Sequence, residues 1–357
     1  MKIKFGLYGS GWRAEFFLRV AKLLPGSFEI VGLVTRSDEK VARFTQEFGV
    51  RCYKTPEEML TAASPDFVVV SIAASANVEV SLKLLGMGVP VLLETPPATS
   101  LESLIHFHKS LPAGAKIQVA EQYPFQPMHA ARLAFVAGGK LGQIQHTQVS
   151  YSHGYHAVAL IRQYLGVAYE NAEITATAFP VNVVGGYTRA GEPTHEAILQ
   201  KTQTIAVLKF SSGKTGIVNF EGDQHRSWVR SHIIQVKGDR GEIFNHQIKY
   251  LQNFNTPIET KLKRKTLGTD DNFEGVDLKG IQADGAWQYR NPHTGSRLVD
   301  DEIAIAHLLA NMANYTKGGQ PAYSLNQGLQ DMYLSLLIDQ AVKEGRAVVS
   351  ETQAWCE

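Results

Sequence analysis

Short apolar runs alternate with helical patterns over residues 1–121. The runs that we predict as strands are Ile3–Tyr8, Ile30–Thr35, Phe67–Ala73, Val89–Leu93 and Lys116–Ala120. The third run opens with an unbroken apolar stretch, as expected for a parallel strand that is covered on both faces. Because strands that alternate with helices form βαβ units, this region predicts an α/β domain with a doubly wound parallel sheet.

The pattern changes after residue 121. One helix is predicted over Met128–Ala137, and a second follows His156 and ends near Gly166. Strand-like segments come next, two of them joined by the turn Ser211-Ser212-Gly213-Lys214; they are Glu173–Phe179, Thr202–Phe210, Thr215–Glu221 and His232–Lys237. We therefore predict a second, α+β domain over residues 122–357, built on an antiparallel or mixed sheet.

The last third of the chain carries one weakly patterned segment and two helices. Residues 255–300 are polar and form either a long hairpin or a lid. The helices are predicted at about Asp301–Tyr315 and Ser324–Glu344, and the second opens with the capping box Ser324-Leu325-Asn326-Gln327. They belong to the second domain by position, with the alternative that they pack back on the first.

A glycine-rich motif follows the first strand and opens a helix: Gly9-Ser10-Gly11-Trp12-Arg13-Ala14. Gly9 allows a tight turn, Gly11 lets the backbone approach a pyrophosphate, and Ala14 lets helix and strand pack closely. The pyrophosphate of a dinucleotide would then lie on the unpaired N–H groups at the helix N-terminus. A tight turn without a ligand is the alternative, but the surrounding strand, helix and further βαβ unit favour a Rossmann dinucleotide site.

The end of the second predicted strand, Val34-Thr35-Arg36-Ser37, bears on the choice between NAD and NADP. A site that prefers NAD usually has an acidic residue here, which binds the ribose 2′-hydroxyl. The guanidinium of Arg36 can instead pair with a 2′-phosphate or stack on the adenine. These residues favour NADP. Two alternatives remain: Asp38 nearby could bind the ribose of NAD, or Arg36 could simply face solvent.

The composition is that of a globular protein without a strong charge bias. Of the 357 residues 44% are hydrophobic, and the net charge is +1, which gives no reason to expect nucleic acid as a partner. The two cysteines, Cys52 and Cys356, suit a reducing compartment. The sequence has no signal-peptide pattern and no apolar run of the ~18 residues that a membrane span needs. We therefore expect a cytoplasmic protein without a membrane partner.

Stretches along essentially the whole chain are typical of one family. They are Gly6–Gly11, Asp66 before the third strand, Gly88–Pro96, Lys140–Ile144, His156, Lys209–Gly213 and Tyr323–Leu325. In them the chain resembles the Gfo/Idh/MocA oxidoreductases. The resemblance implies NAD(P)-dependent oxidation of a sugar or cyclitol hydroxyl, or reduction of the ketone. It also implies a Rossmann domain followed by a domain on a large, mostly antiparallel open sheet, through which homodimers or homotetramers form.

The catalytic residues depart from this family's pattern, which has a lysine, an aspartate and a histidine. The lysine position is Thr95, in Glu94-Thr95-Pro96, the aspartate position is Ser152, and the histidine is His156. A further histidine common in the family is matched by Glu79. Because Thr95 and Ser152 carry no charge, they cannot stabilise a developing alkoxide as a lysine does. His156 remains an acid–base candidate, with a helix-end hydrogen bond as its structural alternative.

Neighbouring side chains complete the candidate sites. The catalytic candidates are His156, Ser152, Thr95 and Tyr155, and those for the substrate are His153, Tyr123, His225 and Trp228. His225 and Trp228 lie in a run that is either a sugar site or a polar hairpin tip with one packed tryptophan. Tyr187-Thr188-Arg189 is a weaker candidate, more typical of loop surface. The residues expected at the cofactor are Gly9, Ser10, Gly11, Trp12, Arg13, Thr35, Arg36, Ala73, Asn77, Glu94 and Gln122. No metal is expected, because His153 and His156 lack a third ligand with suitable spacing.

Two kinds of function are compatible with these residues. The first is an NAD(P)-dependent oxidoreductase acting on a sugar, cyclitol or related polyol or keto-sugar; a variant retains its cofactor and cleaves glycosides or epimerises its substrate. The second is a cofactor- or sugar-sensing regulatory protein without turnover. Loss of the lysine and the aspartate favours the second, whereas the acid–base side chains around His156 favour the first. We predict the enzyme.

Overall fold

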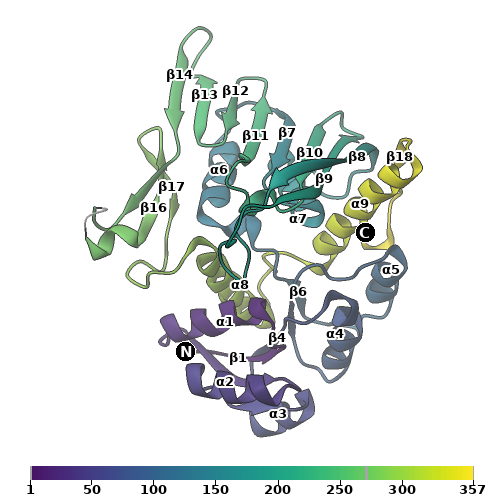
Figure 1. Cartoon of the computed structure of the whole chain (residues 1–357), viewed down its shortest axis with the longest axis vertical. Helices are drawn as coiled ribbons and strands as arrows, with labels where there is room; N and C mark the ends of the chain where they lie inside the picture. Colours follow the sequence, from purple (N-terminus) through teal and green to yellow (C-terminus); the bar gives the residue numbers. More distant parts are fainter. Residues whose placement is uncertain (1, 270–271, 357) are drawn as a thin grey trace. The chain divides into compact units, whose positions relative to one another are not determined.

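The computed structural model describes residues 2–269 and 272–356. The chain forms two compact units, each with a sheet of its own. The first unit comprises Met1–Pro127, Arg264–Gly280 and Arg290–Leu329, and the second comprises Met128–Lys263, Ile281–Tyr289 and Gln330–Glu357. Figure 1 labels many of the elements of both.

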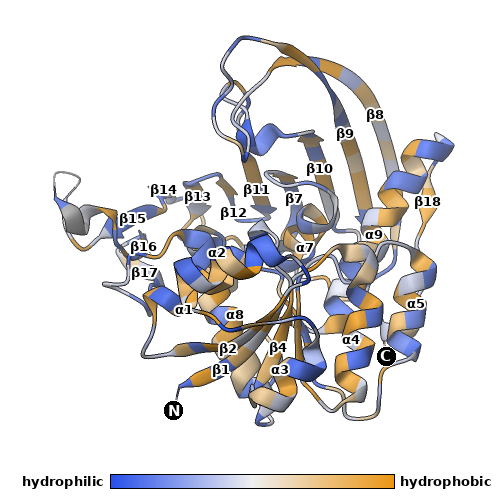
Figure 2. Cartoon of the chain, turned by 60° about the horizontal axis from the view of Figure 1, so that its bottom comes forward, coloured by the Kyte–Doolittle hydropathy of each residue, from blue (hydrophilic) through white to orange (hydrophobic). Residues whose placement is uncertain are grey.

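A parallel six-stranded sheet, in the order β3-β2-β1-β4-β5-β6, forms the centre of the first unit. Its strands are β1 (Ile3–Tyr8), β2 (Phe28–Val34), β3 (Cys52–Tyr53), β4 (Phe67–Val70), β5 (Val91–Leu93) and β6 (Ile117–Val119). Every residue of β4 is buried, and β1, β2 and β4 are mostly hydrophobic in Figure 2. The doubly wound fold predicted from the apolar runs is confirmed, and only β3 was not predicted, because two residues carry no pattern.

Helices pack around this sheet. They are α1 (Trp12–Leu23), α2 (Asp38–Phe48), α3 (Pro56–Ala62), α4 (Asn77–Gly86), α5 (Leu101–Lys109) and α8 (Asp300–Thr316), with the 3₁₀ turns η1 (Ala74–Ala76), η2 (Tyr123–Phe125) and η4 (Phe273–Val276). Helix α3 begins directly after Thr55, whose hydroxyl accepts the Glu58 N–H at 3.2 Å and so caps the helix. Helix α8, from the last fifth of the chain, packs against α1 and β4 and so completes the core of the first unit.

The second unit is built on a nine-stranded sheet in the order β14-β13-β12-β11-β7-β10-β9-β8-β18. Its strands are β7 (Ile144–Ser150), β8 (Ala172–Val184), β9 (Ile198–Phe210), β10 (Thr215–Glu221), β11 (Ile233–Gly238), β12 (Gly241–Phe244), β13 (Gln247–Leu251), β14 (Pro257–Lys261) and β18 (Val348–Val349). Only β7 and β10 pair in parallel, so the sheet is mixed and mostly antiparallel, as predicted. Strands β8 and β9 are longer than their apolar pattern suggests.

One face of this sheet is covered by α7 (Gly154–Leu165), which packs on β7 and β10. The approach is close: a Cβ at Gly216 would lie 2.4 Å from Cγ2 of Ile161. The unit also contains α6 (Pro127–Ala137) and most of α9 (Leu325–Glu344), and a buried ion pair between Arg162 and Asp331 joins α7 to α9. Because α7 begins at Gly154, the predicted helix start after His156 is wrong, and His156 lies in the first turn.

The opposite face of the sheet is open along β8 and β9. The register places Phe179 opposite Gln203 and Leu199 opposite Val183, on the face that points away from α7. Phe179 and Leu199 are 42% and 40% exposed, respectively. Polar and hydrophobic residues alternate along much of β8 in Figure 2, as expected for a strand covered on one face only.

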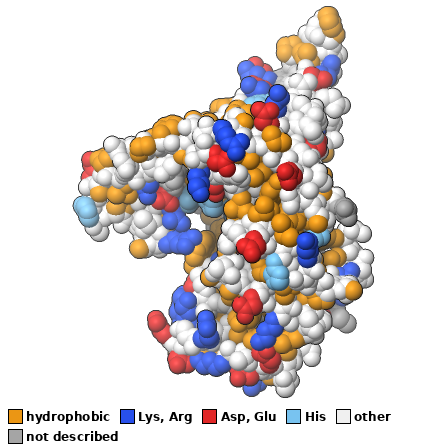
Figure 3. All heavy atoms as spheres, turned by 90° about the vertical axis from the view of Figure 1, so that its right-hand side faces the viewer, with side chains coloured by type: hydrophobic (Ala, Val, Ile, Leu, Met, Phe, Trp, Pro, Cys, Tyr) orange, Lys and Arg blue, Asp and Glu red, His pale blue; other side chains and the backbone are white. Residues whose placement is uncertain are grey.

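The weakly patterned segment 255–300, expected to form a long hairpin or a lid, contains four strands whose bounds the sequence did not give. Strand β14 extends the large sheet, and β15 (Lys263–Thr266), β16 (Leu278–Ala283) and β17 (Ala286–Arg290) form a three-stranded sheet. Within the ranges 2–269 and 272–356, no helix is both long and apolar enough to cross a membrane. On the face seen in Figure 3, acidic and basic side chains are interspersed and neither sign forms a continuous patch.

Candidate functional site

A pocket with a cavity volume of about 640 Å³ lies at the carboxyl ends of β1, β2 and β4 in the first unit. The strand order reverses between β1 and β4, and doubly wound sheets bind their ligands at such a point. The walls include the whole motif from Gly9 to Arg13, together with Thr35, Arg36 and Ala73. The pocket therefore collects most of the side chains that the sequence assigns to a cofactor.

The two motif glycines meet different demands. Gly9 has φ of 123°, and a Cβ there would lie 1.9 Å from the Ser71 carbonyl oxygen, so the turn accepts glycine alone. At Gly11, in contrast, a Cβ would meet nothing within 4 Å, so open space lies beside the backbone. Gly11 is also the N-cap of α1 and has no side chain to cap this helix end. The N-terminus of α1 therefore lies beside this open space, where an anion such as a pyrophosphate can approach it.

The end of β2 is rich in hydroxyls and cations. The Ser10 and Thr35 hydroxyls are 2.7 Å apart, and the Lys40 ammonium donates to the Ser10 carbonyl at 2.7 Å. Arg36 is exposed and lines the pocket. The Asp38 carboxylate instead accepts a hydrogen bond from Lys54, which lowers the pKa of Asp38.

The segment that carries Thr95 is held from behind by Asn77. This buried amide donates to the carbonyl oxygens of Glu94 at 3.2 Å and Pro96 at 2.8 Å, on either side of Thr95. The Thr95–Pro96 peptide bond is cis. Asn77, Glu94 and Gln122 are not among the residues that line the pocket. Asn77 is thus placed to position the neighbouring backbone.

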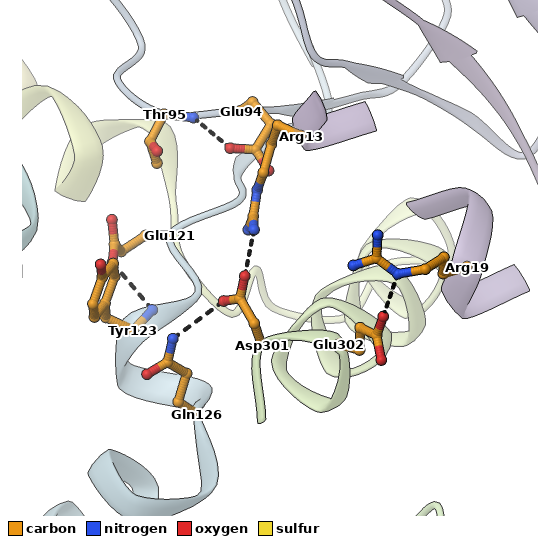
Figure 4. A network of polar contacts seen from close by, with 9 residues as sticks. All are labelled: Arg13, Arg19, Glu94, Thr95, Glu121, Tyr123, Gln126, Asp301 and Glu302. Atoms are coloured by element: carbon orange, nitrogen blue, oxygen red, sulfur yellow. Dashed lines mark hydrogen bonds and ion pairs between the residues drawn. The ribbon is translucent and has the colours of Figure 1, made fainter. Parts of the chain in front are cut away.

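An ionic network, drawn in Figure 4, extends from the motif. Nε of Arg13 donates to Oε1 of Glu94 at 2.8 Å, and Nη1 donates to Oδ2 of Asp301 at 2.5 Å. Although burial opposes it, the charges of Glu94 and Asp301 raise the pKa of Arg13. Gln126 donates to the other oxygen of Asp301 at 3.1 Å. The sequence assigned no role to Asp301, whose only signal is the acidic run that opens α8.

Imidazoles gather at the start of α7 in the second unit. The His153 and His156 rings lie 5.4 Å apart, His153 lies 6.3 Å from the Phe220 ring, and Phe220 stacks on His225 at 6.2 Å. Burial, followed by the neighbouring His156 and His225, lowers the pKa of His153 to about 4. This places three predicted site histidines, from two distant stretches of sequence, in one cluster.

The other predicted residues of this region differ in their surroundings. Tyr155 is buried, with its ring 5.3 Å from that of His156. Ser152 is 2% exposed, and its hydroxyl has no hydrogen-bond partner among the described residues. Trp228 is 60% exposed, so the alternative of a packed tryptophan is wrong. Tyr123 belongs to the first unit, where its N–H donates to the Glu121 carboxylate at 3.2 Å.

A small cavity of about 70 Å³ in the second unit joins two stretches that the sequence analysis treated separately. Its walls include Tyr187 and Thr188 from one stretch and Asp223 and Arg226 from the other. The contact is close, because a Cβ at Gly186 would lie 2.5 Å from the Arg226 carbonyl oxygen. In the part of the chain that the structure describes, no group of three or more His, Cys, Asp or Glu side chains is placed to hold a metal ion.

Comparison with known proteins gives one family match and many matches of fold. Residues 3–118 match the model GFO_IDH_MocA, described as an oxidoreductase family with an NAD-binding Rossmann fold. No curated protein sequence matches significantly. Among solved structures, an oxidoreductase from Agrobacterium radiobacter in complex with NAD⁺, L-tartaric acid and magnesium is 16% identical, with a TM-score of 0.68 and 98% of each chain covered.

Two further structures extend this similarity. The WlbA dehydrogenase from Bordetella pertussis, in complex with NADH and UDP-GlcNAcA, is 17% identical, with a TM-score of 0.66 over 99% of this chain and 100% of that one. An NAD-binding oxidoreductase from Klebsiella pneumoniae is 15% identical, with a TM-score of 0.70 over the same shares of the two chains. At these identities the structures share the fold with this chain along its whole length.

Proposed function

We propose that the protein is an NAD(P)-dependent oxidoreductase, because residues 3–118 match the family model of oxidoreductases with an NAD-binding Rossmann fold. Its substrate would be a sugar, a cyclitol or a related polyol or keto-sugar. The observation that carries this proposal is the pocket at the ends of β1, β2 and β4, where Gly9 makes the turn and Gly11 leaves the α1 N-terminus open to a pyrophosphate. The chain's own residues therefore fit the cofactor.

The bound nicotinamide would supply a hydride acceptor or donor, and the chain must move the proton. We assign this role to His156, in the first turn of α7 beside His153 and Tyr155. Thr95 and Ser152 would contribute hydroxyls for orientation, without charge. His153, His225, Trp228 and Tyr123 remain the proposed substrate contacts.

The test is turnover by the full-length chain across a panel of sugars, cyclitols and their keto forms, followed by the change in nicotinamide absorbance. We expect His156→Ala to abolish turnover and to change cofactor affinity by no more than a few-fold, because His156 is not among the residues that line the pocket. Turnover that survives in this variant would contradict the assignment of His156.

Within this function, we propose NADP(H) as the preferred cofactor. Arg36 lines the pocket, and Lys40 donates to the Ser10 carbonyl. Asp38, the acid that could bind the ribose 2′-hydroxyl of NAD, is hydrogen-bonded to Lys54. Arg36→Ala should weaken NADPH binding by about tenfold, the loss of roughly one charge-assisted hydrogen bond, and leave NADH binding nearly unchanged. Equal losses for both dinucleotides would contradict the preference.

The second candidate function is a sensor that binds the cofactor or a sugar without turnover, or an enzyme that retains its cofactor. Its support is the uncharged pair at the family's catalytic positions, Thr95 and Ser152, the latter with a buried hydroxyl that lacks a partner among the described residues. Tight dinucleotide binding by calorimetry without turnover on any substrate of the panel would favour this candidate.

We also propose a homodimer or homotetramer that forms through the open face of the nine-stranded sheet. The exposed Phe179 and Leu199 on that face support it. Sedimentation of the wild type against Phe179→Asp/Leu199→Asp is the test, and a monomeric wild type would contradict it.

A further inference from the structure

Arg13 is a charged side chain in the wall of the dinucleotide pocket, and carboxylates engage it on two sides. Its side chain is 16% exposed; Nε bonds to Glu94 and Nη1 bonds to Asp301. It is the only charged residue of the motif Gly9–Ala14. An arginine so placed joins the phosphate-binding turn to two other segments of the first unit.

The first of these segments is Glu94-Thr95-Pro96. The Glu94 side chain is 7% exposed, and while Oε1 accepts from Arg13, Oε2 accepts the Thr95 N–H at 3.1 Å. One carboxylate thus connects the guanidinium to the backbone that follows β5. This contact, drawn in Figure 4, fixes the segment relative to the motif, and the two bonds from Asn77 hold the same segment from α4.

The second segment is the N-terminus of α8. Its first turn holds three consecutive acids, each paired with an arginine: Asp300 with Arg264 at 2.7 Å, Asp301 with Arg13 at 2.5 Å and Glu302 with Arg19 at 2.6 Å. Carboxylates are favoured at this end of a helix. Of these arginines only Arg13 lines the pocket, so Arg19, which joins the same two helices, is a natural control.

We propose that Arg13 is a positioning residue that preforms the nicotinamide half of the pocket by holding the Glu94–Pro96 segment against the phosphate-binding turn. The proposal rests on the proposed function. In a doubly wound site the pyrophosphate lies at the first helix and the adenine ribose lies at the end of β2, so the nicotinamide half extends toward β4 and β5. Without the guanidinium, Glu94 and Asp301 are two poorly exposed carboxylates without their countercharge, and the segment loses its fixed position.

The experiment is calorimetric binding by the full-length chain. The ligands are NADPH or NADH, whichever the wild type binds more tightly, and the matching fragment without nicotinamide, 2′-phospho-ADP-ribose or ADP-ribose. The variants are Arg13→Met, Arg13→Lys and the control Arg19→Met. We expect Arg13→Met to weaken the dinucleotide by about tenfold or more, as loss of a charge-assisted bond implies, and the fragment by less than about threefold.

Arg13→Lys keeps the positive charge but not the planar guanidinium with its several donors. Its dinucleotide affinity should therefore lie between that of the wild type and that of Arg13→Met. Arg19→Met should bind both ligands as the wild type does. The proposal is overturned if dinucleotide and fragment lose affinity by the same factor, if Arg19→Met shows the same loss, or if neither Arg13 variant shows any. Should Arg13→Met not fold, the ratio of the two ligands in Arg13→Lys decides. A wild type that binds no dinucleotide would instead overturn the proposed function.

Discussion

The two sheets of this protein differ in how many of their faces are buried. In the parallel sheet of the first unit, every residue of β4 is buried, and α1 and α8 belong to its packing. In the nine-stranded sheet, α7 covers one face, while β8 and β9 expose Phe179 and Leu199 on the other. A sheet that is buried on both faces can offer a ligand only its strand ends, and the pocket of the first unit lies there.

In the nine-stranded sheet, the covered and the open face carry different kinds of side chain. Its candidate catalytic side chains do not lie on the open face but near the N-terminus of α7, where the His153 ring lies beside those of His156 and Phe220. Phe220 shares its face with Gly216, the residue that contacts α7. The candidate catalytic residues therefore lie on the covered side of the sheet, and the open face is the one that we propose for assembly.

The largest effect should come from the buried ion pair between α7 and α9. Arg162 is 3% exposed and its partner Asp331 is fully buried, so Arg162→Met leaves an uncompensated charge and should lower the free energy of unfolding by about 3–5 kcal/mol. Arg264→Met, which breaks the more exposed pair with Asp300, should cost less than about 1 kcal/mol. Urea denaturation measures both. Similar losses in the two variants would show that burial does not separate these pairs.

The next effect compares the two faces of one sheet. Leu208 in β9 is fully buried on the α7 side, so Leu208→Ala should cost about 2–5 kcal/mol. Phe179→Ala, on the open face, should cost less than about 1 kcal/mol in the isolated chain. Denaturant midpoints at low protein concentration are the measurement. A large cost at Phe179 would mean that its face is covered in solution.

At the strand ends of the first unit, the two motif glycines should separate stability from binding. Gly9→Ala, in a left-handed conformation against the Ser71 carbonyl, should cost about 1–3 kcal/mol and abolish dinucleotide binding. Gly11→Ala should leave the melting temperature within about 2 °C, since its Cβ meets open space, yet weaken binding because the pyrophosphate needs that space. Calorimetry and thermal melts check both, and normal binding by Gly11→Ala would contradict the site.

The smallest effect is a pH dependence of the second unit. Burial, and then the charge of Arg132, hold the pKa of His129 well below its usual value. Below about pH 6.5, His129 binds a proton in the unfolded state but not in the folded state. The free energy of unfolding therefore decreases by about 1.4 kcal/mol for each unit by which the pH is lowered. His129→Gln should flatten this slope in urea melts between pH 6.5 and pH 5. An unchanged slope would assign it to other groups.

Much of the fold was predictable because it depends on local patterns. The apolar run at β4, the threonine cap of α3 and the turn between β9 and β10 are each contained in a few neighbouring residues. Strand β3 was not predicted, because two residues show no hydrophobic period. For residues 255–300 the sequence left a long hairpin or a lid open and gave no strand bounds, because exposed polar strands such as β15 show no such period either. Their pairing depends on partners elsewhere in the chain.

The sequence by itself determined the dinucleotide motif, because Gly9, Gly11 and Ala14 are required by the local geometry of one turn and one helix. Only the tertiary structure decided which charges act there. Lys54 engages Asp38 and leaves Arg36 to line the pocket, and Asp301 reaches Arg13 across 288 residues of sequence. Charged side chains pair with those that lie close in space, and the spacing of residues along the chain does not predict which ones these are.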